Sequence, residues 1–486
     1  MQVPFGEWLP DQPEHGKNGA NVANNVYHAA NTYKRFPSLV SYSSNTASTD
    51  SKGAGSFRDN SNTVYNFVAT RTNIYQLTSG AFTSRKASLT GTATDFWTFT
   101  QFGEYVIASN GVDQPQYYLM GTSTNFANLS AIATGNPVFR VSGVVRDFLV
   151  TGNITNATNR IQWSGINDIT TWTAGTSQSD SQDLPGSGGQ VVAITSGEVG
   201  YVFRQNQIIR MDYVGGATVF RLSVISPNRG AMYGRTVCQD NRQIFFYADD
   251  GFYQINGDQI LPIGVEKVNR FFDLNLNKAF ADRICAAVDP FNQLAMWLYP
   301  SASNTSNTTG ICDRIIIYNY ATKKWSLAEA NASTIFPQYI GAYTVELMDI
   351  ISENLDNINA SLDTDFWSGG QQFLGAVDSD YKAAIFSGTS NECEVETAEI
   401  EPFPGLRSNI TGVRPIVDAA ATVTVKARER LADSESETSS SSMVASGMNP
   451  VRKSGRYIRA NVKVASGTIF NHAQGIDLVA SRAGVR

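Results

Sequence analysis

The chain has 486 residues, and its 42% hydrophobic and 11% aromatic content is enough to build large cores and excludes wholesale disorder. That length exceeds one ordinary core and indicates roughly two to four domains, unless a repeat architecture lets each unit bury its face on its neighbour. The net charge of −6 argues against nucleic-acid recognition driven by neutralisation of phosphates.

Charged residues make up 16% of the chain, against about 25% in typical domains. The polar surface must therefore consist largely of Ser, Thr, Asn, Gln and Gly, a composition that suits sheet assemblies and protein–protein contacts. A channel through which nucleic acid slides would also carry few basic residues, because basic surfaces bind it.

Few residues are of the kinds that bind metals or form disulfides. None of the four cysteines belongs to a CxxC pair and only three histidines are present, so we expect no metal and no cofactor. Cys238 and Cys285 fall in strand-like runs, where we expect buried thiols. The N-terminus lacks a secretory signal, and no run of about 18 apolar residues is present. We expect a soluble protein made in a cytoplasm, without a membrane span.

Residues 1–50 show little regular pattern. Several prolines fix extended or turn geometry there, and aromatic side chains supply apolar anchors. We expect an N-terminal extended arm that lies across its own domain or a neighbouring subunit; a partly ordered terminus is the alternative. The prolines and anchors are Pro4, Pro10, Pro13, Pro37, Trp8, Tyr27, Tyr33 and Phe36.

The stretch 190–263 sets the pattern for the middle of the chain. Each half holds short runs rich in Val, Ile, Phe and Tyr, separated by two-residue turn signals such as Asn206-Gln207 and Gly257-Asp258. Runs of this kind are strands joined as hairpins, and the 3.6-residue period of a helix is absent. This stretch therefore predicts an antiparallel meander that occurs at least twice.

The same unit of an aromatic-rich strand, a turn and a second strand recurs from residue 63 to residue 318. Six aromatic markers in it lie 40 to 53 residues apart, which matches the roughly 40–50-residue, four-stranded blade of a β-propeller. We therefore predict an all-β protein with a propeller over residues 51–388; a stacked sandwich or a solenoid is the competing interpretation. The markers are Tyr65, Tyr105, Phe148, Tyr201, Phe246 and Trp297.

After Trp325 the period breaks. The segment 329–363 is expected to be a longer insertion or an irregular blade. A last strand pair returns at 373–377 and 383–388, so we count six or seven irregular blades.

Residues 389–486 follow a different pattern. In the runs 393–400, 421–428 and 457–464, apolar and polar residues alternate with period two, which indicates strands with one solvent-exposed face. A low-complexity loop, 434–442, separates two of these runs. We predict an appended C-terminal β-sandwich or barrel, with four glycines at its hairpin corners. They are Gly405, Gly412, Gly447 and Gly467.

No motif of known chemistry stands out. Walker, GxSxG, HExxH and GxGxxG motifs are absent, so we name no catalytic residue. His472 is best interpreted as a turn or packing residue and Asp250 as part of a hairpin turn. The run 163–172 is similar to the Asp box of sialidase propellers, although a tight turn capped by aromatic residues explains it.

Basic residues cluster once, at 452–459. They form either a solvated hairpin face or a docking edge for an acidic partner chain. Together with two aromatic anchors of the arm they are our candidate partner-contact residues: Trp8, Tyr27, Arg452, Lys453, Arg456 and Arg459.

Three segments resemble short-tailed (podovirus) phage tail proteins. The opening 5–11, followed by Asn25-Val26-Tyr27, is similar to their start, and 163–172 is similar to a turn in their repeat region. The runs 454–459 and 473–477 are similar to their final domain. The family is the tail nozzle or hub, also called tail tubular protein B or packaged-DNA stabilisation protein.

This resemblance implies a homohexameric ring below the portal and adaptor, a central channel for double-stranded viral DNA, and lateral surfaces for tail fibres. We therefore expect a structural virion protein rather than an enzyme, made in the host cytoplasm and located in the phage tail. It would retain packaged DNA until ejection without reading its sequence. A propeller glycosidase and a carbohydrate-binding adhesin acting on host surface glycans are the alternatives.

Overall fold

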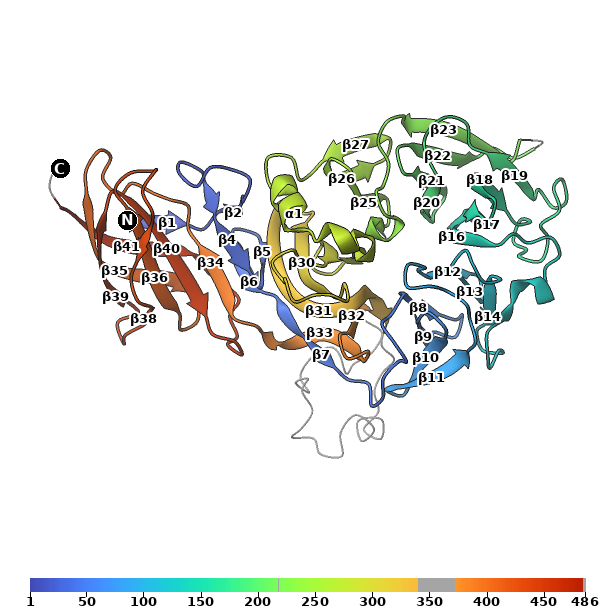
Figure 1. Ribbon diagram of the computed structural model, residues 1–486, viewed down its shortest axis with the longest axis horizontal. Helices are drawn as coiled ribbons and strands as arrows, with labels where there is room; N and C mark the ends of the chain where they lie inside the picture. Colours follow the sequence, from blue (N-terminus) through green and yellow to red (C-terminus); the bar gives the residue numbers. More distant parts are fainter. Residues whose placement is uncertain (217, 340–371, 484–486) are drawn as a thin grey trace.

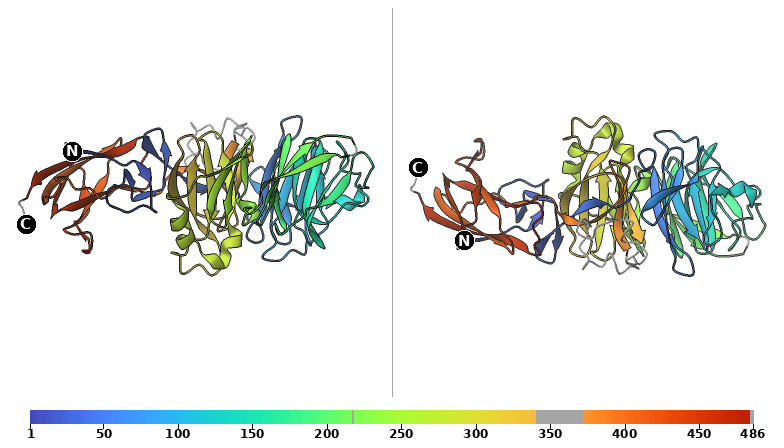
Figure 2. Two further views of the ribbon diagram at one scale, coloured as in Figure 1. Left: turned by 90° about the horizontal axis from the view of Figure 1, so that it is seen from above. Right: turned by 90° about the horizontal axis from the view of Figure 1, so that it is seen from below.

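A computed structural model describes residues 1–216, 218–339 and 372–483. It contains a ring of β-sheets and an elongated β-domain beside the ring (Figure 1). Seen from above and below, the ring is a disc whose sheets stand roughly side by side, and both chain termini lie in the elongated domain (Figure 2). The chain is therefore an all-β protein in two parts.

Five blades of the ring are separate four-stranded antiparallel sheets, each formed by consecutive strands. They are β8 (Gly53–Arg58), β9 (Val64–Ala69), β10 (Ile74–Thr78) and β11 (Ala81–Lys86); β12 (Thr98–Phe102), β13 (Tyr105–Ser109), β14 (Gln116–Leu119) and β15 (Ala127–Asn128); β16 (Phe139–Val145), β17 (Phe148–Ile154), β18 (Ala157–Trp163) and β19 (Asp180–Asp183); β20 (Val191–Ile194), β21 (Val199–Arg204), β22 (Ile208–Tyr213) and β23 (Phe220–Ser226); and β24 (Cys238–Asp240), β25 (Gln243–Ala248), β26 (Gly251–Asn256) and β27 (Gln259–Pro262).

The sixth and seventh blades share one long strand. β28 (Cys285–Asp289), β29 (Leu294–Tyr299), β30 (Cys312–Asn319) and the first half of β31 (Lys324–Tyr339) form the sixth. The second half of β31 then pairs with β32 (Gln372–Asp378), which pairs with β33 (Ala383–Ser390). The described residues thus form a propeller of seven blades, the larger of the two expected numbers.

The seventh blade is closed by the N-terminal part of the chain. Its outermost strand is β7 (Pro37–Ser41), which pairs antiparallel with β33. Ile385 lies opposite Val40, so residues about 345 positions apart in sequence share one sheet. This closure gives a ring rather than an open stack, and the solenoid alternative is wrong.

The sequence markers all lie on the second strand of their blades, so one marker falls in each of the first six blades. Trp297 lies on β29, where all six side chains are buried, because this strand packs between neighbouring blades on both faces. Its ring stacks on Trp325, and Phe252 of the fifth blade contacts both. Stretch 190–263 contains the fourth and fifth blades, which confirms the repeated meander.

Helical structure is scarce in the described residues. The α-helix α1 (Asn269–Asn275) and a 3-10 segment (Lys278–Arg283) connect the fifth and sixth blades. Two shorter 3-10 turns lie at Leu129–Ala131 and Gly234–Thr236. Among the described residues, no helix is long and apolar enough to cross a membrane.

The C-terminal domain is a β-sandwich that includes the N-terminal arm. One sheet has the order β39 (Asn449–Gly455), β35 (Ser408–Val417), β41 (Ala473–Arg482), β6 (Thr32–Arg35) and β5 (Val26–Ala29), with β1 (Gln2–Pro4) beside β41. The other has β4 (Val22–Asn24), β34 (Cys393–Glu396), β40 (Tyr457–Val464) and β36 (Thr422–Arg428), with β37 (Ser436–Glu437) and β38 (Ser441–Ser442) beside β36. A short parallel pair, β2 (Glu7–Trp8) and β3 (Gly19–Ala20), completes the arm.

Several sequence expectations need correction. Residues 1–50 form strands of both parts rather than only an extended arm, and the expected boundary at residue 388 falls inside β33. Gly412 lies inside β35 at a register shift, not at a hairpin corner. The expected insertion 329–363 begins within β31, and its residues from 340 on lie outside the described residues. The expected burial of Cys238 and Cys285 is confirmed.

Closure of the ring by β7 can be measured with two truncations. Removing residues 1–35 leaves β7 in place, whereas removing residues 1–41 deletes it. The second truncation also loses the β7–β33 pairing. Its free energy of unfolding should therefore be about 2–4 kcal/mol lower than that of the first, because each lost backbone hydrogen bond costs about 1 kcal/mol. Urea unfolding followed by tryptophan fluorescence gives both values, and equal values for the two truncations would contradict this role of β7.

Candidate functional site

The arm is fixed to the propeller by its opening motif. Phe5 is buried, and Gly6 has a positive φ of 67° in a place where a Cβ would lie 2.6 Å from the Asn18 carbonyl oxygen. The Trp8 indole donates to the Asn21 carbonyl at 3.1 Å and packs edge-on against Phe271. These contacts hold the motif in one conformation.

Asp11 links the same motif to α1. Its carboxylate accepts hydrogen bonds from the backbone N–H groups of Arg270 at 2.8 Å and Phe271 at 2.7 Å. Lys267, just before the helix, pairs with Glu7 at 2.7 Å. The opening motif therefore positions the connection between the fifth and sixth blades.

The two ends of the chain are paired in the sandwich. β1 runs antiparallel to β41, and the Met1 ammonium lies 3.0 Å from the Asp477 carboxylate. A Cβ at Gly475 would lie 2.3 Å from the Val3 carbonyl oxygen, so the close approach of β1 requires glycine there. Gly475 belongs to the second sequence run that resembles the phage family.

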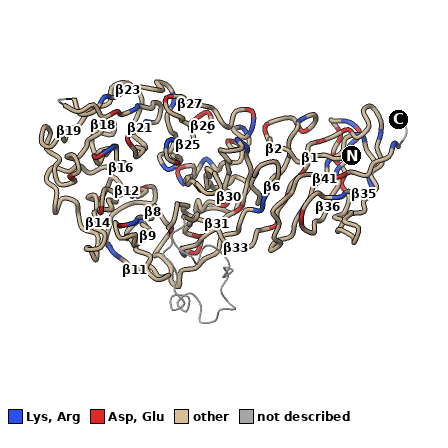
Figure 3. The backbone as a smooth tube through the Cα atoms, turned by 180° about the vertical axis from the view of Figure 1, so that it is seen from behind, with Lys and Arg blue, Asp and Glu red and all other residues tan. Residues whose placement is uncertain are grey.

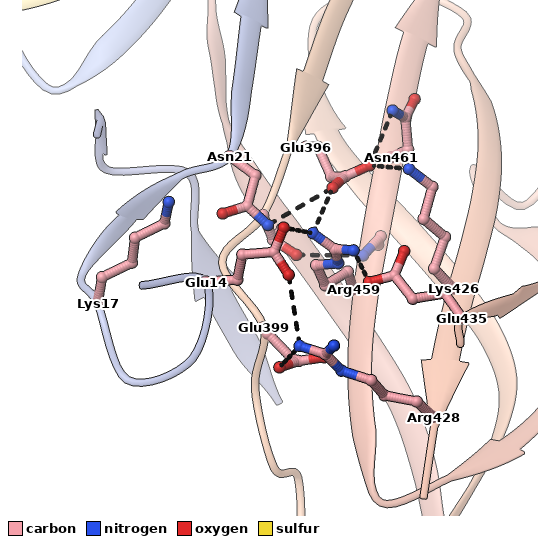
Figure 4. Close-up of polar contacts among 12 residues, drawn as sticks. Glu14, Lys17, Asn21, Glu396, Glu399, Lys426, Arg428, Glu435, Arg459 and Asn461 are labelled. Atoms are coloured by element: carbon pink, nitrogen blue, oxygen red, sulfur yellow. Dashed lines mark hydrogen bonds and ion pairs between the residues drawn. The ribbon is translucent and has the colours of Figure 1, made fainter. Parts of the chain in front are cut away.

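A network of buried charges joins the arm to the sandwich (Figure 4). Arg459 pairs with Glu14 of the arm at 3.0 Å, with Glu396 of β34 at 3.3 Å, and with Glu435. Arg428 binds both oxygens of Glu399, at 2.6 and 2.7 Å, and also reaches Glu14 at 3.3 Å.

Burial makes this network specific. Only 7% of the Arg459 side chain is exposed, and Glu396 and Glu399 are almost fully buried. Lys426 is the third cation, 2.6 Å from Glu396. Since a buried charge without its partner is strongly unfavourable, Glu396 and Glu399 depend on these cations, whereas Glu14, at 49% exposed, is the outer member that connects the arm.

Lys17 lies beside the network, at the loop that carries Glu14 (Figure 4). Its ammonium donates to the Leu9 carbonyl oxygen at 2.9 Å rather than to a carboxylate. Burial lowers the pKa of Lys17, which Glu14 opposes and Arg459 reinforces. The network itself has four carboxylates and three cations, and Lys17 is a further cation beside it whose charged form is disfavoured by burial.

His28 connects the arm to the sixth blade. Its Nε2 lies 3.1 Å from the Lys324 ammonium, and its ring packs edge-on against Tyr33. Burial, with the Lys324 charge as the second cause, lowers the pKa of His28 from 6.5 to about 4.

The structure separates the candidate partner-contact residues. Trp8 and Arg459 are buried in the contacts given above. The Tyr27 hydroxyl lies 3.4 Å from Asn292 Oδ1, and burial raises its pKa. Arg456 binds Glu401 at 2.9 Å and the Gly405 carbonyl at 2.8 Å. Arg452 is exposed and Lys453 is half-buried. Contact with a partner stays a prediction for all six residues.

The other sequence candidates lie in turns. His472 is exposed, and its backbone N–H donates to Asp418 at 2.9 Å. Asp250 pairs with Arg229 at 2.7 Å beside the hairpin of β25 and β26, and Asp168 accepts from Thr170 and Thr171 in the turn after β18. In the part of the chain that the structure describes, no group of three or more His, Cys, Asp or Glu could hold a metal ion.

A cavity of about 650 Å³ lies on the propeller axis, where the innermost strands of all seven blades line it. Its size is typical of small-molecule sites, roughly 300–1,000 Å³. Asp282 is the one carboxylate among the described residues that line it, whereas glycoside hydrolysis ordinarily uses two. Sequence reasoning missed this cavity because seven separate segments form it; polar residues around the first strand of each blade were the available signal.

Comparisons with known proteins do not assign the chain to a family. No protein-family model and no curated protein matches it. Similar solved structures include a chain of a mitotic checkpoint complex, at 10% identity and a TM-score of 0.40, over 74% of this chain and 96% of that one. BamB from Moraxella catarrhalis aligns at 11% identity and a TM-score of 0.38, over 75% of this chain and 96% of BamB.

A third similar structure is the extracellular domain described as part of a hybrid two component system from B. thetaiotaomicron. It has 10% identity and a TM-score of 0.42, over 78% of this chain and 42% of that one. Likenesses at this level carry no functional argument. The propeller assignment follows from the sheets described above.

The charge network can be tested by replacing Arg459. Arg459→Met should lower the free energy of unfolding by about 3–5 kcal/mol, because three carboxylates lose a buried partner. The matched control is Lys463→Met, since Lys463 pairs with Glu392 at 2.9 Å but is 40% exposed, and should cost at most about 1 kcal/mol. Chemical denaturation measures both; similar losses for the two variants would refute a special role for the buried network.

His28 predicts a particular pH dependence of stability. Because its pKa is lower in the folded chain, the unfolded chain takes up the proton first as the pH falls. The contribution of neutral His28 is therefore complete above pH 6.5 and is lost as the pH falls from 6.5 to about 4.

Stability measured against pH for wild type and His28→Gln should differ in slope across that window. His472→Gln, which changes an exposed histidine, should keep the wild-type slope. If His28→Gln also keeps it, the lowered pKa of His28 is wrong.

Proposed function

We propose that the chain is a structural subunit of a short-tailed phage tail, the tail nozzle. Six copies close a ring below the portal and adaptor and enclose the channel through which DNA leaves the virion. The subunit acts mechanically: it holds back the packaged DNA, lets it pass at ejection and carries surfaces for tail fibres. No bond is made or broken in this role, so the proposed protein is not an enzyme.

The observation that carries the proposal is the meeting of the segments on which the family resemblance rests. The opening motif and the runs 454–459 and 473–477 are separated by most of the sequence, yet they pack together. Phe5 N–H donates to the Gln474 carbonyl at 3.0 Å, and Arg459 pairs with Glu14, which follows the motif. Residues that resemble one family at both ends of the chain thus form one structural unit.

Closure of the chain suits a mechanical wall. In the described residues β7 completes the seventh blade of the propeller, and β1 lies along β41 in the sandwich. A force that opens either part must break several paired backbone positions together rather than peel off a loose end. Rigid walls of this kind keep a channel at constant width.

Charge distribution agrees with passage of DNA. Along the backbone of both the propeller and the sandwich, Lys, Arg, Asp and Glu are sparse and of mixed sign, and most positions carry uncharged residues (Figure 3). A surface with little positive charge exerts little attraction on phosphates, so DNA can slide past it.

Ring formation predicts a specific assembly. Mixed with its portal-side adaptor, the purified chain should form particles with sixfold rotational symmetry in electron-microscope class averages, with a light-scattering mass that fits six chains. Each contact between copies should bury more than about 1,000 Å². The adaptor alone is the control.

A monomer at all concentrations, with the adaptor present, would contradict the nozzle proposal. Release of reducing ends from host surface polysaccharide by the pure chain would instead favour a glycosidase. Saturable glycan binding without turnover would favour an adhesin.

A further inference from the structure

We propose that one end of the axial cavity is a binding site for a small oxyanion, such as a phosphate or a carboxylate group. Each blade begins at the axis, so the innermost strands run in the same direction and their starting ends lie together. The residues that carry the proposal lie at these starting ends. The proposal is independent of the role in a phage tail.

Arg235 is the central residue. It lies in the 3-10 turn just before β24 and lines the cavity. Its guanidinium lies 4.4 Å from the ring centre of Phe96, which precedes β12, and donates to Thr334 Oγ1 of β31 at 3.0 Å. Among the described residues, no carboxylate lies within ion-pair distance of it, and its buried Nη1 has no acceptor.

Lys52 lies against the same aromatic ring, and a second cation, Arg283, joins it through a shared acid. Lys52, which precedes β8, is 1% exposed and lies 5.4 Å from the centre of Phe96. Lys52 and Arg283, which precedes β28, share one carboxylate: Asp50, at 2.8 Å from each. Arg235 therefore lines the cavity, and the Lys52–Asp50–Arg283 group, with two cations and one acid, lies behind that lining.

Electrostatics supports a deficit of negative charge here. Burial lowers the pKa of Lys52, and Arg283 and Arg235 lower it further, although Asp50 opposes them. Burial alone would raise the pKa of Asp50, but its bonds to Lys52 and Arg283 lower it. Cations that destabilise one another in a buried cluster are stabilised by any added anion.

The remaining charges of the cavity do not cancel this excess. Asp282 lines the cavity, so Asp50 behind the lining and Asp282 together are two acids against Arg235, Lys52 and Arg283. Arg140 lines the cavity as well, but Asp95 already pairs with it at 2.7 Å. The positive excess stands against the net charge of −6 of the chain, and this makes it a local feature rather than a general one.

Oxyanions match the donors that are present. A guanidinium presents N–H groups in a planar fork that suits phosphate or carboxylate oxygens, and Arg235 lacks such a partner. An anion beside Arg235 would also be attracted by the charges of Lys52 and Arg283 behind the cavity lining. Because these residues come from different blades, the bound anion would connect blades across the axis and stabilise the closed ring.

The test measures binding of inorganic phosphate to the full chain. Phosphate replaces chloride at constant ionic strength, and thermal unfolding and isothermal titration calorimetry are followed. We expect a saturable rise in the unfolding temperature and one phosphate per chain. Arg235→Gln should weaken binding by at least about tenfold, because a charge-assisted hydrogen bond is lost.

Arg221→Gln is the matched control, since it also removes one positive charge but from a side chain that is 66% exposed on β23. It should bind phosphate as wild type does. Arg235→Lys keeps the charge without the fork, so it should bind more weakly than wild type and more tightly than Arg235→Gln; it also serves if Arg235→Gln does not fold.

Citrate in place of phosphate distinguishes a carboxylate site from a phosphate site; preference for either supports the proposal. It is overturned if the unfolding temperature rises without saturation and equally in all variants, which is the general effect of a salting-out anion. Unchanged affinity in both Arg235 variants would overturn it as well.

Discussion

Backbone pairing between sequence-distant segments holds both parts of this chain together. β7 closes the propeller on β33, and β1 lies along β41 in the sandwich. Between these two pairings, β4 lies next to β34 in the sandwich and touches β31 of the propeller at one position, Leu327 opposite Asn24. One N-terminal segment therefore connects the blades to the sandwich, and neither part is complete without it.

Buried charge makes this arrangement specific. Hydrophobic strands can slip in register, but Glu14 has only one place where Arg428 and Arg459 both reach it. Such a network adds little stability compared with a well-packed apolar contact, because its charges lose their water. Its effect is to favour this position of the arm, since here Glu14 adds a partner to both arginines, which also pair with acids of the sandwich.

Local sequence was enough to predict the blades. Markers such as Phe148, Phe246 and Trp297 lie on the second strand of each blade, which is buried on both faces and therefore reads as an aromatic, β-branched run. Outer strands such as β19, with four exposed residues, show no such pattern and went unpredicted. A glycine between alternating runs usually marks a hairpin corner, whereas Gly412 lies at a register shift within β35.

Long-range features could not be predicted in the same way. β7 reads as an ordinary polar segment, PSLVS, and its partner lies about 345 residues away. The cations Lys52, Arg235 and Arg283 lie in three separate connections before innermost strands, and only closure of the ring brings these connections together. Arg459 lies in a basic run of the sequence, but it is buried on β40 between β34 and β36 and pairs with Glu14 from the other end of the chain.

Hydrogen exchange of the full chain tests the central claim most directly. If β7 is a structural strand of the seventh blade, its paired amides should exchange as slowly as those of β33, because both open in the same cooperative event. Exchange of the β7 amides well before those of β33 would show that β7 is only loosely attached. The account of a ring closed by the pairing of β7 with β33 would then be wrong.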